Sequence, residues 1–203
     1  AGKPLAEAGS SSSLDAHSIT KVPIVVARYA GQPEMVEKVL EAVRVHQVHP
    51  VAAESAVSAA VLLERVILGS PLSTALAEAV AVGSPAEGHR GEFEEAVQSI
   101  ESTGSLAETA GALGRSCRLP NALKVVVAGL HKADKEDASF EQAVRDNILA
   151  GGDNCSRAIL LGAVMAAARG SVPEAWAASV DPELWREVGE LADAVLAPCS
   201  GNP

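Results

Sequence analysis

A carboxylate and a hydroxyl lie one helical turn apart, directly after a pair of glycines. They belong to Asp153 and Ser156, which follow Gly151 and Gly152. The glycines permit a tight turn, and the apolar run that begins at Ala158 is typical of a buried helix. The two side chains should therefore share one side of the helix start, where their oxygen atoms suit a hard cation such as Mg²⁺. A simpler interpretation is that Asp153 only caps the helix by accepting hydrogen bonds from free backbone amides.

A thiol stands between these two residues. Cys155 lies at the predicted helix N-terminus, where backbone amides can stabilise a thiolate and make it reactive, but it can equally be an inert small residue of a packed helix. Cys117 and Cys199 are distant in sequence, and no CxxC or CxxH pair accompanies them. We therefore expect neither a disulfide framework nor a zinc site. We expect an intracellular, reducing compartment, with cytosol or organelle left open.

Two histidines precede Pro50 and could in principle share a metal ion. His46 and His49 are three residues apart, but no third ligand follows at a suitable spacing. A polar helix end is therefore the better interpretation of this pair. We assign no role to His17 or Trp185.

The elements that must position these residues are helices. From His17 onward the apolar residues recur at helical spacing, and we count about ten helical segments and no credible strand. Capping boxes at Ser105 and Ser139 predict helix starts, and a helix running from Pro50 towards Gly69 is predicted by its apolar stripe. We expect a mobile tail over residues 1–16 and a single helical domain over residues 17–203.

Composition excludes several classes of partner. The chain has 203 residues and a formal net charge of −10, which opposes binding to nucleic acid or to an anionic membrane surface. Its longest apolar run, residues 158–168, is far shorter than the ~20 residues that cross a bilayer. The chain does not begin with methionine, so we expect a fragment, a processed form or an intact short protein, and the sequence does not choose among them.

The segment around Asp153 resembles the C-terminal signature of the ADP-ribosylglycohydrolase family, which includes the J1 crystallins. The matching residues are Gly151, Gly152, Asp153, Ser156, Gly162, Ala168, Gly170, Pro173 and Trp176. Residues 17–31, 41–47, 63–69, 116–120 and 140–146 are similar, in the same order, to the J1-crystallin-like branch. The resemblance implies a compact all-α domain of the ADP-ribosylglycohydrolase type that lacks the N-terminal portion.

The resemblance also implies a chemistry and a deficiency. Active members use two Mg²⁺ ions to hydrolyse the bond between ADP-ribose and a modified group, with metal ligands from three segments. One of those segments has a counterpart here, in which Asp153 matches the first carboxylate and Ser156 the terminal hydroxyl. Cys155 stands in place of the second carboxylate, and a soft thiol is poorly suited to Mg²⁺. We therefore expect Asp153 and Ser156 to be vestigial magnesium ligands, and the chain alone to be inactive.

Three functional hypotheses follow from the resemblance. The first is a non-catalytic structural or accessory subunit of a larger assembly, with protein partners and no cofactor. The second is part of an active magnesium-dependent hydrolase whose other ligands lie on missing sequence or on a partner chain. The third is a module that binds ADP-ribose or a nucleotide without turnover.

Overall fold

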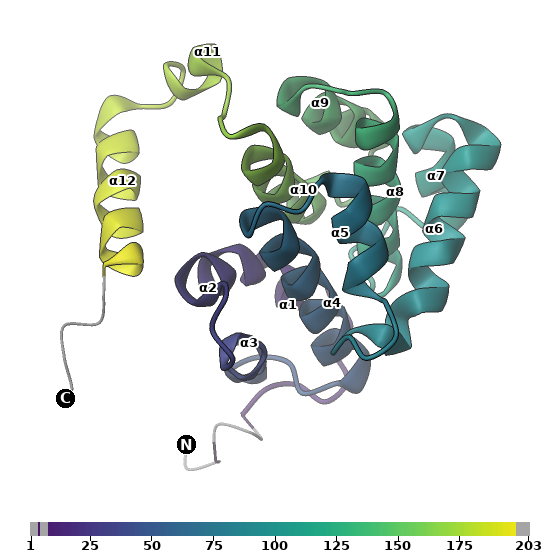
Figure 1. Cartoon of the computed structure of the whole chain (residues 1–203), viewed down its shortest axis with the longest axis horizontal. Helices are drawn as coiled ribbons and strands as arrows, with labels where there is room; N and C mark the ends of the chain where they lie inside the picture. Colours follow the sequence, from purple (N-terminus) through teal and green to yellow (C-terminus); the bar gives the residue numbers. More distant parts are fainter. Residues whose placement is uncertain (1–3, 5–7, 198–203) are drawn as a thin grey trace.

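The structure is a computed structural model that describes residue 4 and residues 8–197. Within these residues it contains twelve α-helices, one short 3-10 helix and no strand, which confirms the predicted all-α class (Figure 1). The only β-type pairings in the described part are two isolated bridges, Ser10 with Gln47 and Asp15 with Arg118. None of the described helices is long and apolar enough to cross a membrane.

The helices follow one another through short connections. In chain order they are α1 (His17–Thr20), α2 (Val22–Tyr29), α3 (Met35–Arg44), α4 (Pro50–Ile67), α5 (Leu72–Ala79), the 3-10 helix η2 (Glu87–His89), α6 (Arg90–Thr103), α7 (Leu106–Leu113), α8 (Asn121–Lys135), α9 (Phe140–Ala150), α10 (Asn154–Arg169), α11 (Glu174–Ala177) and α12 (Pro182–Leu196).

The core is built around α4, α8 and α10. Most residues of α4 and α8 are buried, and many of them are alanine or valine, so neighbouring helices can approach closely. Gly129 of α8 shows how close this approach is, because a Cβ atom added there would lie 3.0 Å from Leu161 of α10 and 3.2 Å from Leu106 of α7. Small residues thus bring the middle of α10 close to α8.

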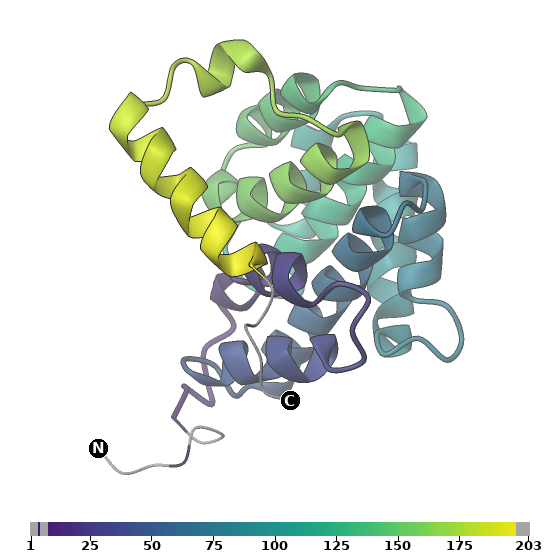
Figure 2. The same cartoon turned by 60° about the vertical axis from the view of Figure 1, so that its left-hand side comes forward.

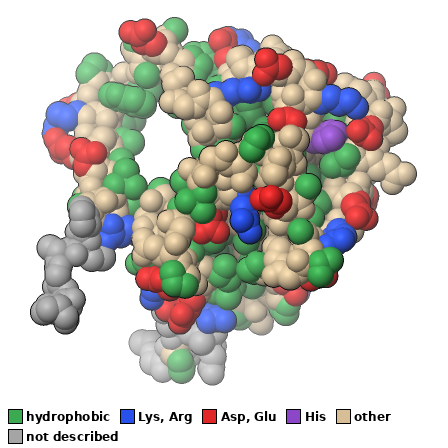
Figure 3. All heavy atoms as spheres, in the orientation of Figure 1, with side chains coloured by type: hydrophobic (Ala, Val, Ile, Leu, Met, Phe, Trp, Pro, Cys, Tyr) green, Lys and Arg blue, Asp and Glu red, His purple; other side chains and the backbone are tan. Residues whose placement is uncertain are grey.

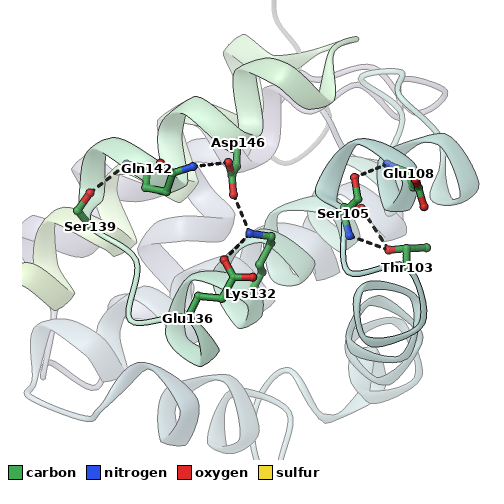
Figure 4. Close-up of polar contacts among 8 residues, drawn as sticks. All are labelled: Thr103, Ser105, Glu108, Lys132, Glu136, Ser139, Gln142 and Asp146. Atoms are coloured by element: carbon green, nitrogen blue, oxygen red, sulfur yellow. Dashed lines mark hydrogen bonds and ion pairs between the residues drawn. The ribbon is translucent and has the colours of Figure 1, made fainter.

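The serine half of each predicted capping box forms, whereas the amide of Ser105 donates to Thr103 Oγ1 and not to Glu108, and the Gln142 side chain bonds Asp146. Ser105 Oγ accepts a hydrogen bond from the amide of Glu108 at 3.4 Å, and Ser139 Oγ accepts one from the amide of Gln142 at 3.1 Å (Figure 4). Residues 125–127, whose valines are also compatible with a strand, lie inside α8. That helix ends at Lys135.

Residues 8–15 run along the helical body before α1 begins at His17. The amide of Ser10 donates to the carbonyl of His46 at 2.8 Å, and the Gln47 side chain donates to the carbonyl of Asp15 at 2.8 Å. The mobility of residues 1–16 and the domain boundary stay predictions.

Candidate functional site

The start of α10 is fixed by its two glycines. Both have a positive φ, 70° at Gly151 and 67° at Gly152. A Cβ atom on Gly152 would lie 2.1 Å from the carbonyl oxygen of Arg115, and the amide of Asp153 donates to that same oxygen at 2.8 Å. The turn is thus docked against the segment between α7 and α8, and glycine at position 152 is needed for space as well as for backbone conformation.

Asp153 and Ser156 meet as their spacing predicts. Ser156 Oγ donates a hydrogen bond to Asp153 Oδ1 at 3.0 Å. Asp153 is the N-cap residue of α10, yet its side chain accepts no hydrogen bond from the helix amides, so the simple capping interpretation is wrong. Its second oxygen, Oδ2, is buried and accepts no hydrogen bond from any described residue.

A buried arginine lies beside this carboxylate. Arg157 is 0% exposed; its Nε donates to Asn147 Oδ1 at 2.9 Å, and its Nη2 donates to the carbonyl of Gly151. Burial lowers the pKa of the Arg157 guanidinium from its ordinary value, although the nearby Asp153 carboxylate opposes this effect. Sequence reasoning missed Arg157, although a cation four residues after Asp153 on an apolar helix was an available signal.

A second carboxylate approaches from the N-terminal segment. Cys117 Sγ donates to Asp15 Oδ1 at 3.2 Å, and the amide of Leu119 donates to the carbonyl of Leu14 at 2.7 Å. The hydrogen bond to Asp15 and burial raise the pKa of the Cys117 thiol, and the charges of Asp15 and Asp153 act in the same direction. Asp15 thus joins the neighbourhood of Asp153, a role that the sequence alone did not assign to it.

The remaining candidates make no contact with these side chains or lie outside the described residues. Cys155 is exposed, with its sulfur 3.7 Å from Asn154 Oδ1. His49 Nδ1 accepts a hydrogen bond from the amide of Val51 at 3.2 Å, as expected for a polar helix end. Cys199 lies outside the described residues.

The helix that leads into the glycine turn is held by a network of charged side chains. Lys132 of α8 donates to Asp146 Oδ2 of α9 at 3.0 Å and also pairs with Glu136 (Figure 4). Gln142 Nε2 donates to the other oxygen of Asp146 at 2.7 Å. Burial acts against the charge of Lys132, but the hydrogen bonds to Glu136 and Asp146 prevail and raise its pKa. This network fixes α9 on α8 and so positions Gly151 at the end of α9.

These residues do not fit a pair of magnesium ions. Magnesium requires nearly octahedral oxygen coordination, and a two-metal site needs several carboxylates. At the start of α10 the Asp153 carboxylate already accepts a hydrogen bond from Ser156, and Cys155, a thiol, lies between these two residues in the sequence. Among the described residues, no group of three or more His, Cys, Asp or Glu side chains could hold a metal ion.

Comparisons with known proteins agree with this architecture. The family model described as ADP-ribosylglycohydrolase matches residues 1–203. No curated protein matches the chain. A solved structure described as an "ADP-ribosylglycohydrolase-related protein complex" is similar in fold, with a TM-score of 0.66 and 20% sequence identity over 92% of this chain. The match covers 61% of that chain, so the present chain spans about three-fifths of the length of its structural neighbour.

Proposed function

Because the chain belongs to the ADP-ribosylglycohydrolase family, we propose that it is a non-catalytic member of the J1-crystallin-like branch that serves as a structural or accessory subunit. The observation that carries this proposal is the donor set at the start of α10. Ser156 donates a hydrogen bond to Asp153. The exposed Cys155 stands where the family signature has its second carboxylate. A thiol and one partly satisfied carboxylate are a poor ligand set for Mg²⁺.

An activity assay tests the proposal directly. The purified chain is incubated with Mg²⁺ and peptides that carry ADP-ribose on arginine or serine, and released ADP-ribose is measured. We expect no turnover above an Asp153→Ala control. Turnover that disappears in this control would contradict the proposal, because it would show a working site within residues 1–203.

One observation favours a second candidate, in which residues outside this chain complete a magnesium-dependent hydrolase. Asp153 Oδ2 is buried without a partner among the described residues, and the structural neighbour is considerably longer than this chain. A buried oxygen of this kind is stabilised by a ligand that supplies the missing interaction.

The two candidate functions predict different activity for the longest form or complex purified from the source. If other sequence completes the site, activity should be found in the longest form or complex purified from the source, and should be lost on Asp153→Ala. A source complex that contains this chain but releases no ADP-ribose would leave the non-catalytic role as the better account.

A further inference from the structure

The helix α12 presents an apolar face that no other described part of the chain covers. None of the residues of α12 is buried, and the helix contacts α2 alone among elements with more than marginal contact. Leu184, Trp185, Val188 and Leu191 recur at helical spacing and are 51%, 49%, 49% and 61% exposed. A contiguous apolar stripe of this kind on a protein surface marks an interaction site.

This helix forms one side of an arch that is fastened at both ends. At one end Trp176 of α11 packs edge-on against Phe140 of α9, with ring centroids 5.8 Å apart. At the other end Arg28 of α2 donates a hydrogen bond to the carbonyl of Ala197. Figures 1 and 2 show α12 standing away from the body between these two attachments. The space-filling view shows an opening through the molecule there, and hydrophobic side chains border it on the side of the arch (Figure 3).

The elements across the opening also expose large apolar side chains. Ile24 of α2 is 63% exposed and Ile159 of α10 is 46% exposed. Exposed apolar side chains therefore occur on α2 and α10 as well as on α12.

We propose that the opening between α12, α2 and α10 receives an amphipathic helix that is not among residues 1–203. A second folded copy is the poorer occupant, because an arch closed at both ends admits an inserted segment more readily than a folded surface. The structural neighbour also contains further residues outside the matched part, since this chain covers 61% of it. The proposal concerns packing and holds whether or not the resulting assembly is catalytic.

The charges of α12 indicate which charges the inserted helix should carry. Its sequence contains Glu183, Glu187, Glu190 and Asp193 against a single basic residue, Arg186. The inserted helix should therefore have apolar residues on two faces and lysine or arginine at its polar positions and ends, since opposite charges favour correct pairing.

A synthetic peptide of about five helical turns, roughly 18 residues, can serve as the probe. It carries Leu and Ala on two faces and Lys at the polar positions, and a matched peptide carries Glu instead. In a Trp176→Phe chain, Trp185 is the remaining tryptophan, and its emission reports on the apolar stripe of α12. We expect a saturable blue shift with the Lys peptide and binding weakened at least tenfold by Leu191→Asp.

The control variant tests whether binding is specific to this face. Val82 is 79% exposed and lines a separate hollow of about 880 Å³ between α5, α6 and α8, so Val82→Asp should leave peptide binding unchanged. The Glu peptide should bind several-fold more weakly, and this difference should shrink in high salt.

Three results would overturn the proposal. The first is an unshifted Trp185 emission at millimolar Lys peptide. The second is peptide binding that is weakened by Val82→Asp but not by Leu191→Asp. The third is a dimer, seen by light scattering, that Leu191→Asp dissociates, which would make a second copy the occupant. Each readout is independent of glycohydrolase activity, so failure here is distinct from failure of the proposed function.

Discussion

Arg157 is the side chain whose loss should destabilise the candidate site most. Arg157→Met leaves the buried Asn147 Oδ1 and the carbonyl of Gly151 without their cationic donor. Hydrogen bonds to a charged group contribute about 1.5–3 kcal/mol each, and removal of the buried charge offsets part of that loss, so we expect about 3 kcal/mol of destabilisation. Urea unfolding followed by circular dichroism measures the difference.

The matched control for this variant is Arg186→Met on α12. The Arg186 side chain is 62% exposed and pairs with Glu190 one turn away, an arrangement that contributes less than about 0.5 kcal/mol. Equal unfolding midpoints for the two variants would show that the bonds of Arg157 contribute no net stability.

The two described thiols should differ in reactivity. Cys117 is half-buried and its pKa is raised by the hydrogen bond to Asp15, whereas Cys155 is exposed. Iodoacetamide at neutral pH should therefore label Cys155 faster than Cys117, as mass mapping can show.

Asp15→Asn removes a negative charge beside Cys117, so the pKa of the Cys117 thiol should fall and the labelling of Cys117 should accelerate. Cys155 serves as the internal reference, and acceleration of both thiols alike would instead indicate general loosening.

Residue spacing predicted the Asp153–Ser156 contact because both residues lie on one turn of a single helix. It could not predict the contact between Asp15 and Cys117, which are 102 positions apart, since that contact depends on how separate segments pack. The buried Oδ2 of Asp153 is equally a result of packing.

The glycine turn between α9 and α10 offers a test of how elements are joined. Gly151 and Gly152 both have a positive φ, and Gly151 has a ψ of −170°, a combination that is essentially restricted to glycine, so alanine at either position incurs a backbone strain of about 1–3 kcal/mol. At Gly152 the new Cβ would also lie 2.1 Å from the backbone oxygen of Arg115, whereas at Gly151 it would meet nothing within 4 Å.

We therefore expect Gly152→Ala to reduce the free energy of unfolding more than Gly151→Ala, because at position 152 the overpacked backbone must also move, at a cost of about 1–3 kcal/mol. Thermal unfolding of the two variants provides the comparison. Similar melting temperatures would mean that the turn yields without strain, and that its docking on Arg115 is loose.

Helix starts leave a clearer local signal in the sequence than helix ends. Ser105 and Ser139 define starts through a local hydrogen bond, which depends on residues three positions apart. Helix α8 ends at Lys135, and its last turn contains the buried Ala133 and the contact of Lys132 with Asp146 of α9. Long-range contacts of this kind leave no local signal.

At the scale of the whole molecule, the arch that ends in α12 should be separable from the body. A chain that stops at Val180 loses α12, which has no buried residue, so its free energy of unfolding should change by less than about 1 kcal/mol. Urea unfolding should remain a single cooperative transition.

A shorter chain that stops at Gly170 provides the contrast, because it also removes Trp176. That residue packs against Phe140 and lies 5.8 Å from the Arg145 guanidinium, and an aromatic pair adds about 0.5–1.5 kcal/mol beyond its buried area. The chain ending at Gly170 should therefore be clearly less stable than the chain ending at Val180. If removal of α12 alone caused the larger loss, α12 would have to pack against the body in solution, which would leave no space for the inserted helix.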